Sequence, residues 1–151
     1  TMNNNIEMDK SLDYNGQNYS HLNNKNGVYD KNLKNENSKI LLNKAILYNN
    51  DGYSNYNDKK FNEALECYNN AYKIYKKVYI NYPYHPDLAN SLNNIGIIYK
   101  NLGDNDKALK SYQKTQECLN RCNETYLNPN PDAATFYKNF GNLYCLKGDF
   151  N

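Results

Sequence analysis

The sequence has no tryptophan and only one arginine, Arg121, among its 18 basic residues. Nucleic-acid-binding proteins usually gather arginine and lysine on one face, whereas the lysines here are scattered among 16 acidic residues and the net charge is only +2. There is no run of about eighteen apolar residues, the length a membrane-spanning helix needs, and no apolar signal segment at the N-terminus. We therefore expect a soluble, cytoplasmic protein that binds neither nucleic acid nor membrane.

Metal-binding and nucleophilic residues are also scarce. The four cysteines, at positions 67, 118, 122 and 145, show no CxxC spacing. Cys118 and Cys122 lie one helical turn apart, but no second pair or nearby histidine completes a zinc site. The two histidines, His21 and His85, are not accompanied by a nucleophile, and there is no glycine-rich phosphate loop. The sequence predicts reduced thiols, no metal, no cofactor and no catalytic site.

Asparagine and tyrosine are abundant instead. Asparagine makes up about a fifth of the chain, a bias that A+T-rich genomes also produce, and tyrosine occurs 17 times against 4 phenylalanines. The mean hydropathy is −1.03, which is polar for a globular protein. Residues 1–37 are rich in asparagine and have no sustained apolar period, so they are expected to form a flexible leader.

From residue 38 onward, apolar residues recur every three to four positions, which is typical of amphipathic helices. One apolar stripe runs from Leu41 to Tyr56, and a cleaner one runs from Phe61 to Tyr82. Pro83 and Pro86 are expected to end the second helix, because proline has no amide hydrogen for the helix interior.

Further helices follow with similar signals. Asp87 is expected to cap the third helix, and Gly103 is expected to end it in the left-handed conformation. Asp104 or Asp106 is expected to begin the fourth helix, and a fifth is expected from Asp132 to Gly148. The sequence therefore predicts an all-α chain in which helix pairs alternate with short turns and longer proline-containing turns.

One phrase of the sequence occurs twice. Asn94–Asp106 returns as Asn139–Asn151, so that its glycines and its tyrosine are displaced by 45 positions. A weaker copy, centred on Gly52, lies 44 positions before the first. Self-similarity at a period of this size is typical of stacked repeat proteins, in which each repeat is one helix pair.

The repeated residues resemble a known family. Leu92-x-x-Ile95-Gly96-x-x-Tyr99 followed by Ala108-x-x-x-Tyr112 is similar to the tetratricopeptide repeat, and His85-Pro86-Asp87-Leu88-Ala89-Asn90-Ser91-Leu92-Asn93-Asn94 resembles the opening of the longer repeats of kinesin light chains. The resemblance implies antiparallel helix pairs stacked into a right-handed superhelix. It places an array over residues 38–151, with repeats at about 45–82, 89–128 and a truncated 134–151.

The same resemblance implies a binding groove lined by the first helix of each pair. The sixth repeat position is asparagine in all three copies, Asn50, Asn94 and Asn139, and these side chains are expected to be exposed and convergent. A carboxamide donates and accepts hydrogen bonds, so such a row suits the backbone of an extended peptide. The abundance of asparagine offers a chance explanation for the row. The other peptide-binding residues implied are Asn49, Asn93, Lys138, Tyr53, Ile97, Asn142 and Lys100.

Two other readings of these residues are less favoured. The lysine and asparagine set that clamps chaperone tails is not reproduced, because Tyr53 replaces an asparagine. His85-Pro86-Asp87 also matches the tripeptide of J-domain cochaperones, but its Pro-Asp recurs at Pro131-Asp132, which favours a helix-initiating turn.

We therefore predict a non-enzymatic scaffold that binds a peptide segment of a partner protein in its groove. The alternative is a structural module that forms a homo-oligomer through its tyrosine-rich second helices or through its C-terminal end. In a third reading, the leader folds into the groove as an autoinhibitory strap through Leu12-Asp13-Tyr14.

Overall fold

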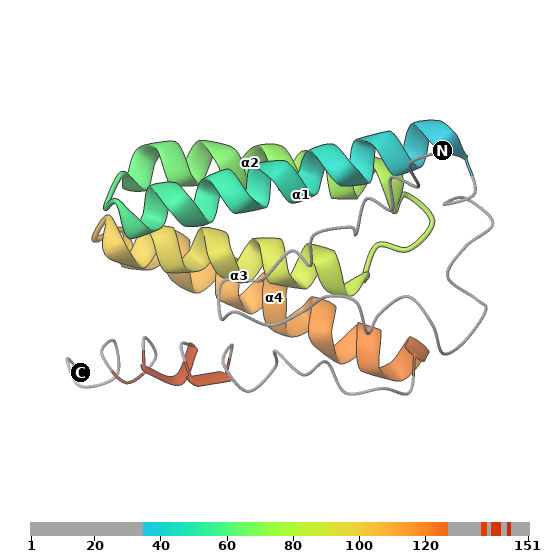
Figure 1. The fold of residues 1–151 in the computed structure, drawn as a ribbon. Coiled ribbons are helices and arrows are strands. Elements are labelled where there is room, and N and C mark those ends of the chain that lie inside the picture. Colours follow the sequence, from blue (N-terminus) through green and yellow to red (C-terminus); the bar gives the residue numbers. More distant parts are fainter. Residues whose placement is uncertain (1–34, 127–136, 139, 143–144, 146–151) are drawn as a thin grey trace.

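The structure, a computed structural model, describes residues 35–126, 137–138, 140–142 and 145. Its helices are α1 (Glu36–Asn57), α2 (Phe61–Val78), α3 (Pro86–Asn101) and α4 (Asn105–Tyr126), and the described part contains no strand. α1 packs along α2, α3 packs along α4, and α2 joins the two hairpins by packing on α3 (Figure 1). The predicted all-α architecture of adjacent helix pairs is confirmed. Residues 1–34 of the predicted leader and most of the third repeat lie outside the described residues.

α1 begins at a capped residue within the sequence predicted to be the leader. The side-chain oxygen of Asn35 accepts a hydrogen bond of 3.0 Å from the backbone N–H of Asn37, which satisfies one of the free donors of the first turn. The helix ends at Asn57, and Lys59 turns the chain with a φ of 60° before α2 begins.

The connection between the hairpins differs from the prediction in two respects. α2 ends at Val78, four residues before Tyr82 and well ahead of the prolines that were expected to stop it. Pro86 begins α3 instead, since the first helical position needs no amide hydrogen. The predicted cap Asp87 is also wrong, because it is already inside the helix. The cap is His85, whose Nδ1 accepts from the backbone N–H of Asp87 at 3.2 Å.

The turn between α3 and α4 follows the prediction. Gly103 has a φ of 80°, a left-handed conformation that glycine adopts without steric cost. Asp104 then accepts from the backbone N–H of Lys107 at 3.1 Å, and its carboxylate lies 2.7 Å from the Lys107 ammonium group. Asp104, the first of the two predicted alternatives, is therefore the residue that caps α4.

The core repeats with a period of 44 residues. Each of the five buried residues of α2 has a buried counterpart on α4: Ala64 with Ala108, Tyr68 with Tyr112, Ala71 with Thr115, Tyr75 with Leu119, and Val78 with Cys122. The first helices obey the same shift, since Ala45 and Ala89 are both buried. The two hairpins are therefore built on one packing scheme, although many of the paired residues differ in type.

Glycine lets the two helices of each hairpin approach closely. A Cβ atom on Gly52 would lie 2.9 Å from the Tyr68 ring, and one on Gly96 would lie 2.5 Å from the Tyr112 ring. The rings thus occupy the space that a side chain would take. The glycine positions of the repeat pattern are therefore points where the backbone of one helix meets an aromatic ring of the other.

Candidate functional site

The predicted groove residues lie on the first helices of the two hairpins. α1 carries Asn49, Asn50 and Tyr53, and the equivalent positions on α3 are Asn93, Asn94 and Ile97. Figure 1 shows α1 and α3 running in the same direction. Equivalent residues of the two repeats therefore occur in the same order along parallel helices.

The exposure of these residues differs between the two helices. Asn50 is exposed and Tyr53 is 38% exposed, as a surface site requires. Asn94 is only 8% exposed and Ile97 only 6%, so the expectation that Asn94 is an exposed residue is wrong. Lys100, near the end of α3, is half-buried.

The position of α3 in the stack explains this difference. α3 packs against both α2 and α4, and ten of its 16 residues are buried. α1 packs mainly against α2, and only Ala45 and Gly52 of its 22 residues are buried. Residues at the same repeat position are therefore covered to different extents.

The third repeat contributes less to the described site. Lys138 and Asn142 are helical and exposed. Asn139, the third member of the predicted asparagine row, lies outside the described residues. Phe140 packs edge-on against the buried Tyr112, with ring centroids 6.2 Å apart, and so connects this segment to α4.

Asn49 and Asn93 share an unusual feature. Both are half-buried, and the side-chain oxygen of each is covered without a hydrogen-bond partner in the part of the chain that the structure describes. The amide nitrogen of Asn49 donates to the hydroxyl of Tyr75 at 3.0 Å. A covered acceptor without a donor costs about 1–3 kcal/mol. These two amide oxygens, one repeat apart, are therefore the acceptors that an added N–H donor would stabilise most.

Tyr75 belongs to an aromatic stack that the sequence pattern did not single out as part of a site. Its ring lies parallel to that of Tyr79, with centroids 6.0 Å apart, and Tyr79 stacks on the His85 imidazole at 3.6 Å. The Tyr79 hydroxyl donates to Asp87 at 2.7 Å. This stack joins Asn49 on α1 to the start of α3. The tyrosine stripe and the His-Pro-Asp run were both visible in the sequence. Their contact could not be predicted from it, because the contact depends on the conformation of the turn between them.

The electrostatics of His85 fit a structural role. Burial lowers the pKa of the imidazole, and the nearby Asp87 carboxylate opposes that effect only in part. The neutral ring keeps Nδ1 free of a proton, so that it can accept from the Asp87 N–H. His85-Pro86-Asp87 thus starts a helix, as the recurrence of its Pro-Asp at Pro131-Asp132 favoured. Pro131-Asp132 itself lies outside the described residues.

The buried thiols are poor ligands and nucleophiles. Burial raises the pKa of Cys118 to about 12 and that of Cys122 to about 11, so the thiolate that metal binding requires is disfavoured. Cys118 donates weakly to the backbone oxygen of His85, at a distance of 3.7 Å. Over the residues described, no three His, Cys, Asp or Glu side chains come together in an arrangement that would hold a metal ion.

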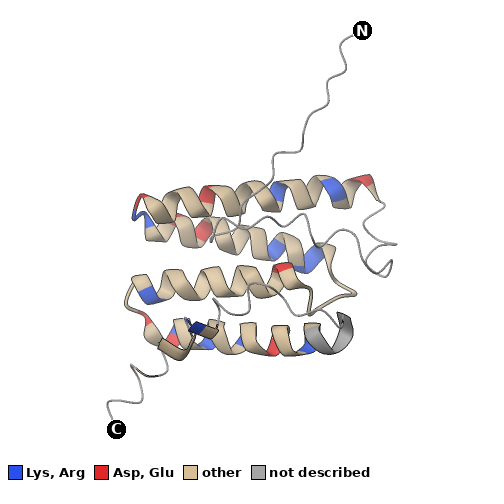
Figure 2. Cartoon of the chain, turned by 60° about the horizontal axis from the view of Figure 1, so that its bottom comes forward, with Lys and Arg blue, Asp and Glu red and all other residues tan. Residues whose placement is uncertain are grey.

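Each of the four helices carries charged residues of both signs (Figure 2). They are spread along α1, α2 and α4, whereas α3 has only Asp87 near its start and Lys100 near its end. None of the described helices is both long enough and apolar enough to cross a membrane. The distribution agrees with the scattered charge of the sequence.

Comparisons with known proteins agree with this architecture. Residues 43–121, just over half of the chain, match the tetratricopeptide repeat family. The chain is also 33% identical over 88 residues to the photosystem I assembly protein Ycf3 of Prochlorococcus marinus; the match covers 58% of this chain and 40% of that relative. No solved structure matches the chain significantly. With its helix pairs in register and the family match across both described hairpins, the chain belongs to the tetratricopeptide repeat family.

Proposed function

We propose that this chain is a non-catalytic scaffold that binds an extended peptide of a partner protein along α1 and α3. The family and the resemblance to an assembly protein support a role in protein interaction. The finer assignment is that Asn50, Asn94 and Asn139 form one row of peptide contacts, with Asn94 at the floor of the groove because it is largely covered. The spacing of 44 residues between hairpins supports a long repeat of the kinesin light chain-like type.

The observation that carries the proposal is the pair of amide oxygens on Asn49 and Asn93. They stand at the same repeat position, and neither has a hydrogen-bond donor in the described part of the chain. The backbone of an extended peptide presents N–H groups along its length. Because both oxygens are covered in the free chain, the two half-buried amides would turn outward on binding, so that each oxygen accepts from a peptide N–H group. Tyr53 and Lys100, at least partly exposed beside them, would contact the peptide side chains.

The proposal is tested with peptides selected for binding to the intact chain from a random library. Affinity is then measured by fluorescence anisotropy for the wild type and for the Asn50→Ala/Asn93→Ala variant. We expect the variant to bind at least about tenfold more weakly, because each hydrogen bond to the peptide backbone is worth about 1 kcal/mol. Its melting temperature should not fall, since neither side chain forms a hydrogen bond with another described residue and Asn93→Ala removes a covered acceptor that has no donor.

A matched control changes two exposed asparagines on the second helices, Asn62 on α2 and Asn120 on α4. The Asn62→Ala/Asn120→Ala variant alters composition equally and should bind as the wild type does. If every selected peptide binds the Asn50→Ala/Asn93→Ala variant with unchanged affinity, the groove assignment fails.

Self-association is the second candidate function. The tyrosines of α2 do not favour it, because Tyr68 and Tyr75 are buried in the hairpin. The favouring observation lies on α1 instead, where Ile40 is 58% exposed and Leu47, two turns later, is 63% exposed. Light scattering across a hundredfold range of concentration distinguishes the candidates: a constant monomer mass removes this one.

A further inference from the structure

A surface hollow of about 220 Å³ lies on the side of the second helices. α2, α3, α4 and the turn before α3 all contribute to it, through Tyr72, Pro83, Tyr84, Leu88, Leu92, Lys114, Glu117 and Cys118. α1, which carries Asn50, contributes no lining residue. The hollow is therefore a surface separate from the proposed groove.

The side chains at the base of the hollow are apolar and largely covered. Leu88 and Cys118 are each 4% exposed and Leu92 is 8% exposed, while the tyrosines of the walls, Tyr72 and Tyr84, are half-buried. An apolar cavity of about 150 Å³ in a protein core is large enough to hold benzene. A hollow of this size therefore accommodates one aromatic ring or one branched aliphatic side chain.

The rim of the hollow is mainly cationic. Lys114 lines it, and Lys76 and Arg121 stand over the rings of its two wall tyrosines, Tyr72 and Tyr84, at 5.7 Å and 5.5 Å. Glu117 is the one acidic residue in the lining. Among the described residues, neither Lys76 nor Lys114 forms an ion pair with an acidic side chain. Three cations thus surround an apolar floor with one carboxylate between them.

The turn that forms one wall is held from two directions. The backbone oxygen of His85 accepts the weak hydrogen bond from Cys118, and the His85 ring stacks on Tyr79 at 3.6 Å. These contacts fix the chain directly after Pro83 and Tyr84. A site whose wall is already ordered loses little conformational entropy when a ligand binds.

We propose that this hollow is a second protein-binding site, which takes one apolar ring side chain of a partner peptide flanked by aspartate or glutamate residues. The ring would pack between Tyr72 and Tyr84 on the leucine floor, where offset or edge-on aromatic pairs are stabilising. The flanking carboxylates would face Lys76, Lys114 and Arg121, which sets specificity and speeds association. A buried anchor ringed by charge is the arrangement in which one side chain contributes most of the binding energy.

The experiment titrates the intact, isotope-labelled chain with the peptide acetyl-Glu-Asp-Phe-Asp-Glu-amide and follows backbone NMR signals. We expect saturable shifts centred on Leu88, Leu92 and Cys118. Two control peptides replace the phenylalanine by glycine or all four acids by lysine, and each should bind at least about tenfold more weakly. No shift at the hollow with the first peptide, or equal affinity for either control, would overturn the proposal; equal binding of the glycine peptide would mean that only its charge is recognised.

Two charge reversals complete the test. Lys114→Glu should weaken binding of the first peptide about fivefold or more, because a rim cation becomes an anion. Lys77→Glu makes the same change in net charge on α2, but Lys77 points about 100° around the helix from Lys76 and does not line the hollow. It should leave the affinity within about twofold. Equal weakening in the two variants would refute a defined site. The groove variant Asn50→Ala/Asn93→Ala should bind this peptide normally, so the two proposals fail independently.

Discussion

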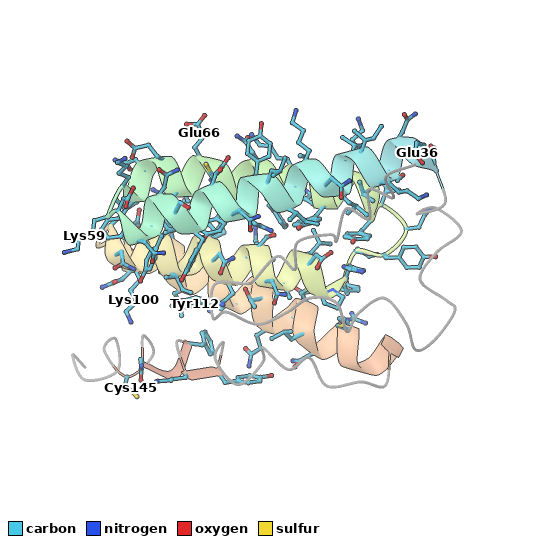
Figure 3. The ribbon with its side chains drawn as sticks, viewed as in Figure 1. Glu36, Lys59, Glu66, Lys100, Tyr112 and Cys145 are labelled. Atoms are coloured by element: carbon cyan, nitrogen blue, oxygen red, sulfur yellow. The ribbon has the colours of Figure 1, made fainter. Side chains whose placement is uncertain are left out.

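Replacing Gly96 by alanine tests whether close packing of backbone against ring defines the hairpin. The added Cβ would meet three atoms of the Tyr112 ring at 2.5, 2.7 and 3.2 Å. Ordinary carbon–carbon contacts lie at about 3.5–4.0 Å. Tyr112, labelled in Figure 3, is fully buried at 0% exposed, so its ring cannot avoid the new Cβ atom by turning out into solvent. One helix must therefore move away from the other.

The magnitude follows from two opposing effects. Overpacking a core typically costs about 1–3 kcal/mol, and a contact this short belongs at the upper end. Alanine also favours the helix over glycine by about 1 kcal/mol. We therefore expect Gly96→Ala to lower the free energy of unfolding by about 2 kcal/mol. Gly52→Ala should cost less, because its nearest contact, with Tyr68, is 2.9 Å.

The assay is urea unfolding followed by helical circular dichroism, with a double-mutant cycle. Tyr112→Leu shortens the side chain that the new Cβ would meet, so in this background Gly96→Ala should no longer destabilise and should gain up to about 1 kcal/mol. A cost of about 2 kcal/mol in both backgrounds would refute the reasoning, because the destabilisation would then not come from the contact with the ring.

Two further predictions concern buried titratable groups. Burial holds the pKa of His85 below 6.5 in the folded chain, so the unfolded chain binds more protons as the pH falls below about 6.5. Stability should therefore decrease from that pH down to the folded pKa and then level off; His85→Asn, which retains a capping oxygen, should remove this dependence of the urea midpoint on pH, and an unchanged dependence would count against the role of His85. Cys145 is exposed, whereas Cys118 and Cys122 are buried with raised pKa values of about 12 and about 11. Mass spectrometry after brief iodoacetamide treatment at about pH 8 should find Cys145 alkylated and the other two modified only in urea; rapid labelling of Cys118 in the folded chain would contradict its burial.

Local signals predicted most of the helix pattern. The three-to-four spacing placed α1 to α4, Gly103 marked the end of α3, and Asp104 was one of two named caps for α4. The errors cluster between the hairpins. A stripe of tyrosines continues the helical period past Val78, but Tyr79 instead turns to stack on His85, and the imidazole takes the capping role expected of Asp87. Both differences arise from side-chain contacts in the turn, and the spacing of apolar residues along the sequence does not predict such contacts.

The candidate site was less predictable for a related reason. The repeat pattern assigns equivalent roles to Asn50 and Asn94, yet one is exposed and the other is largely covered. The pattern also gives no indication of the hollow, because Tyr72, Tyr84 and Lys114 lie on three different segments. Their proximity follows from the way α2 and α4 approach the intervening turn.

Residue order alone therefore specified the helix pairs and the register in which they repeat, since apolar periodicity and the small residues at close contacts are local properties of the chain. Which of the equivalent residues are exposed was decided by helix stacking. α3 packs against both α2 and α4 and is mostly buried, whereas α1 packs mainly against α2 and keeps more of its surface exposed. The covered amide oxygens and the cation-rimmed hollow likewise depend on the tertiary structure. They arise where segments distant in the chain come together, and no single segment contains them.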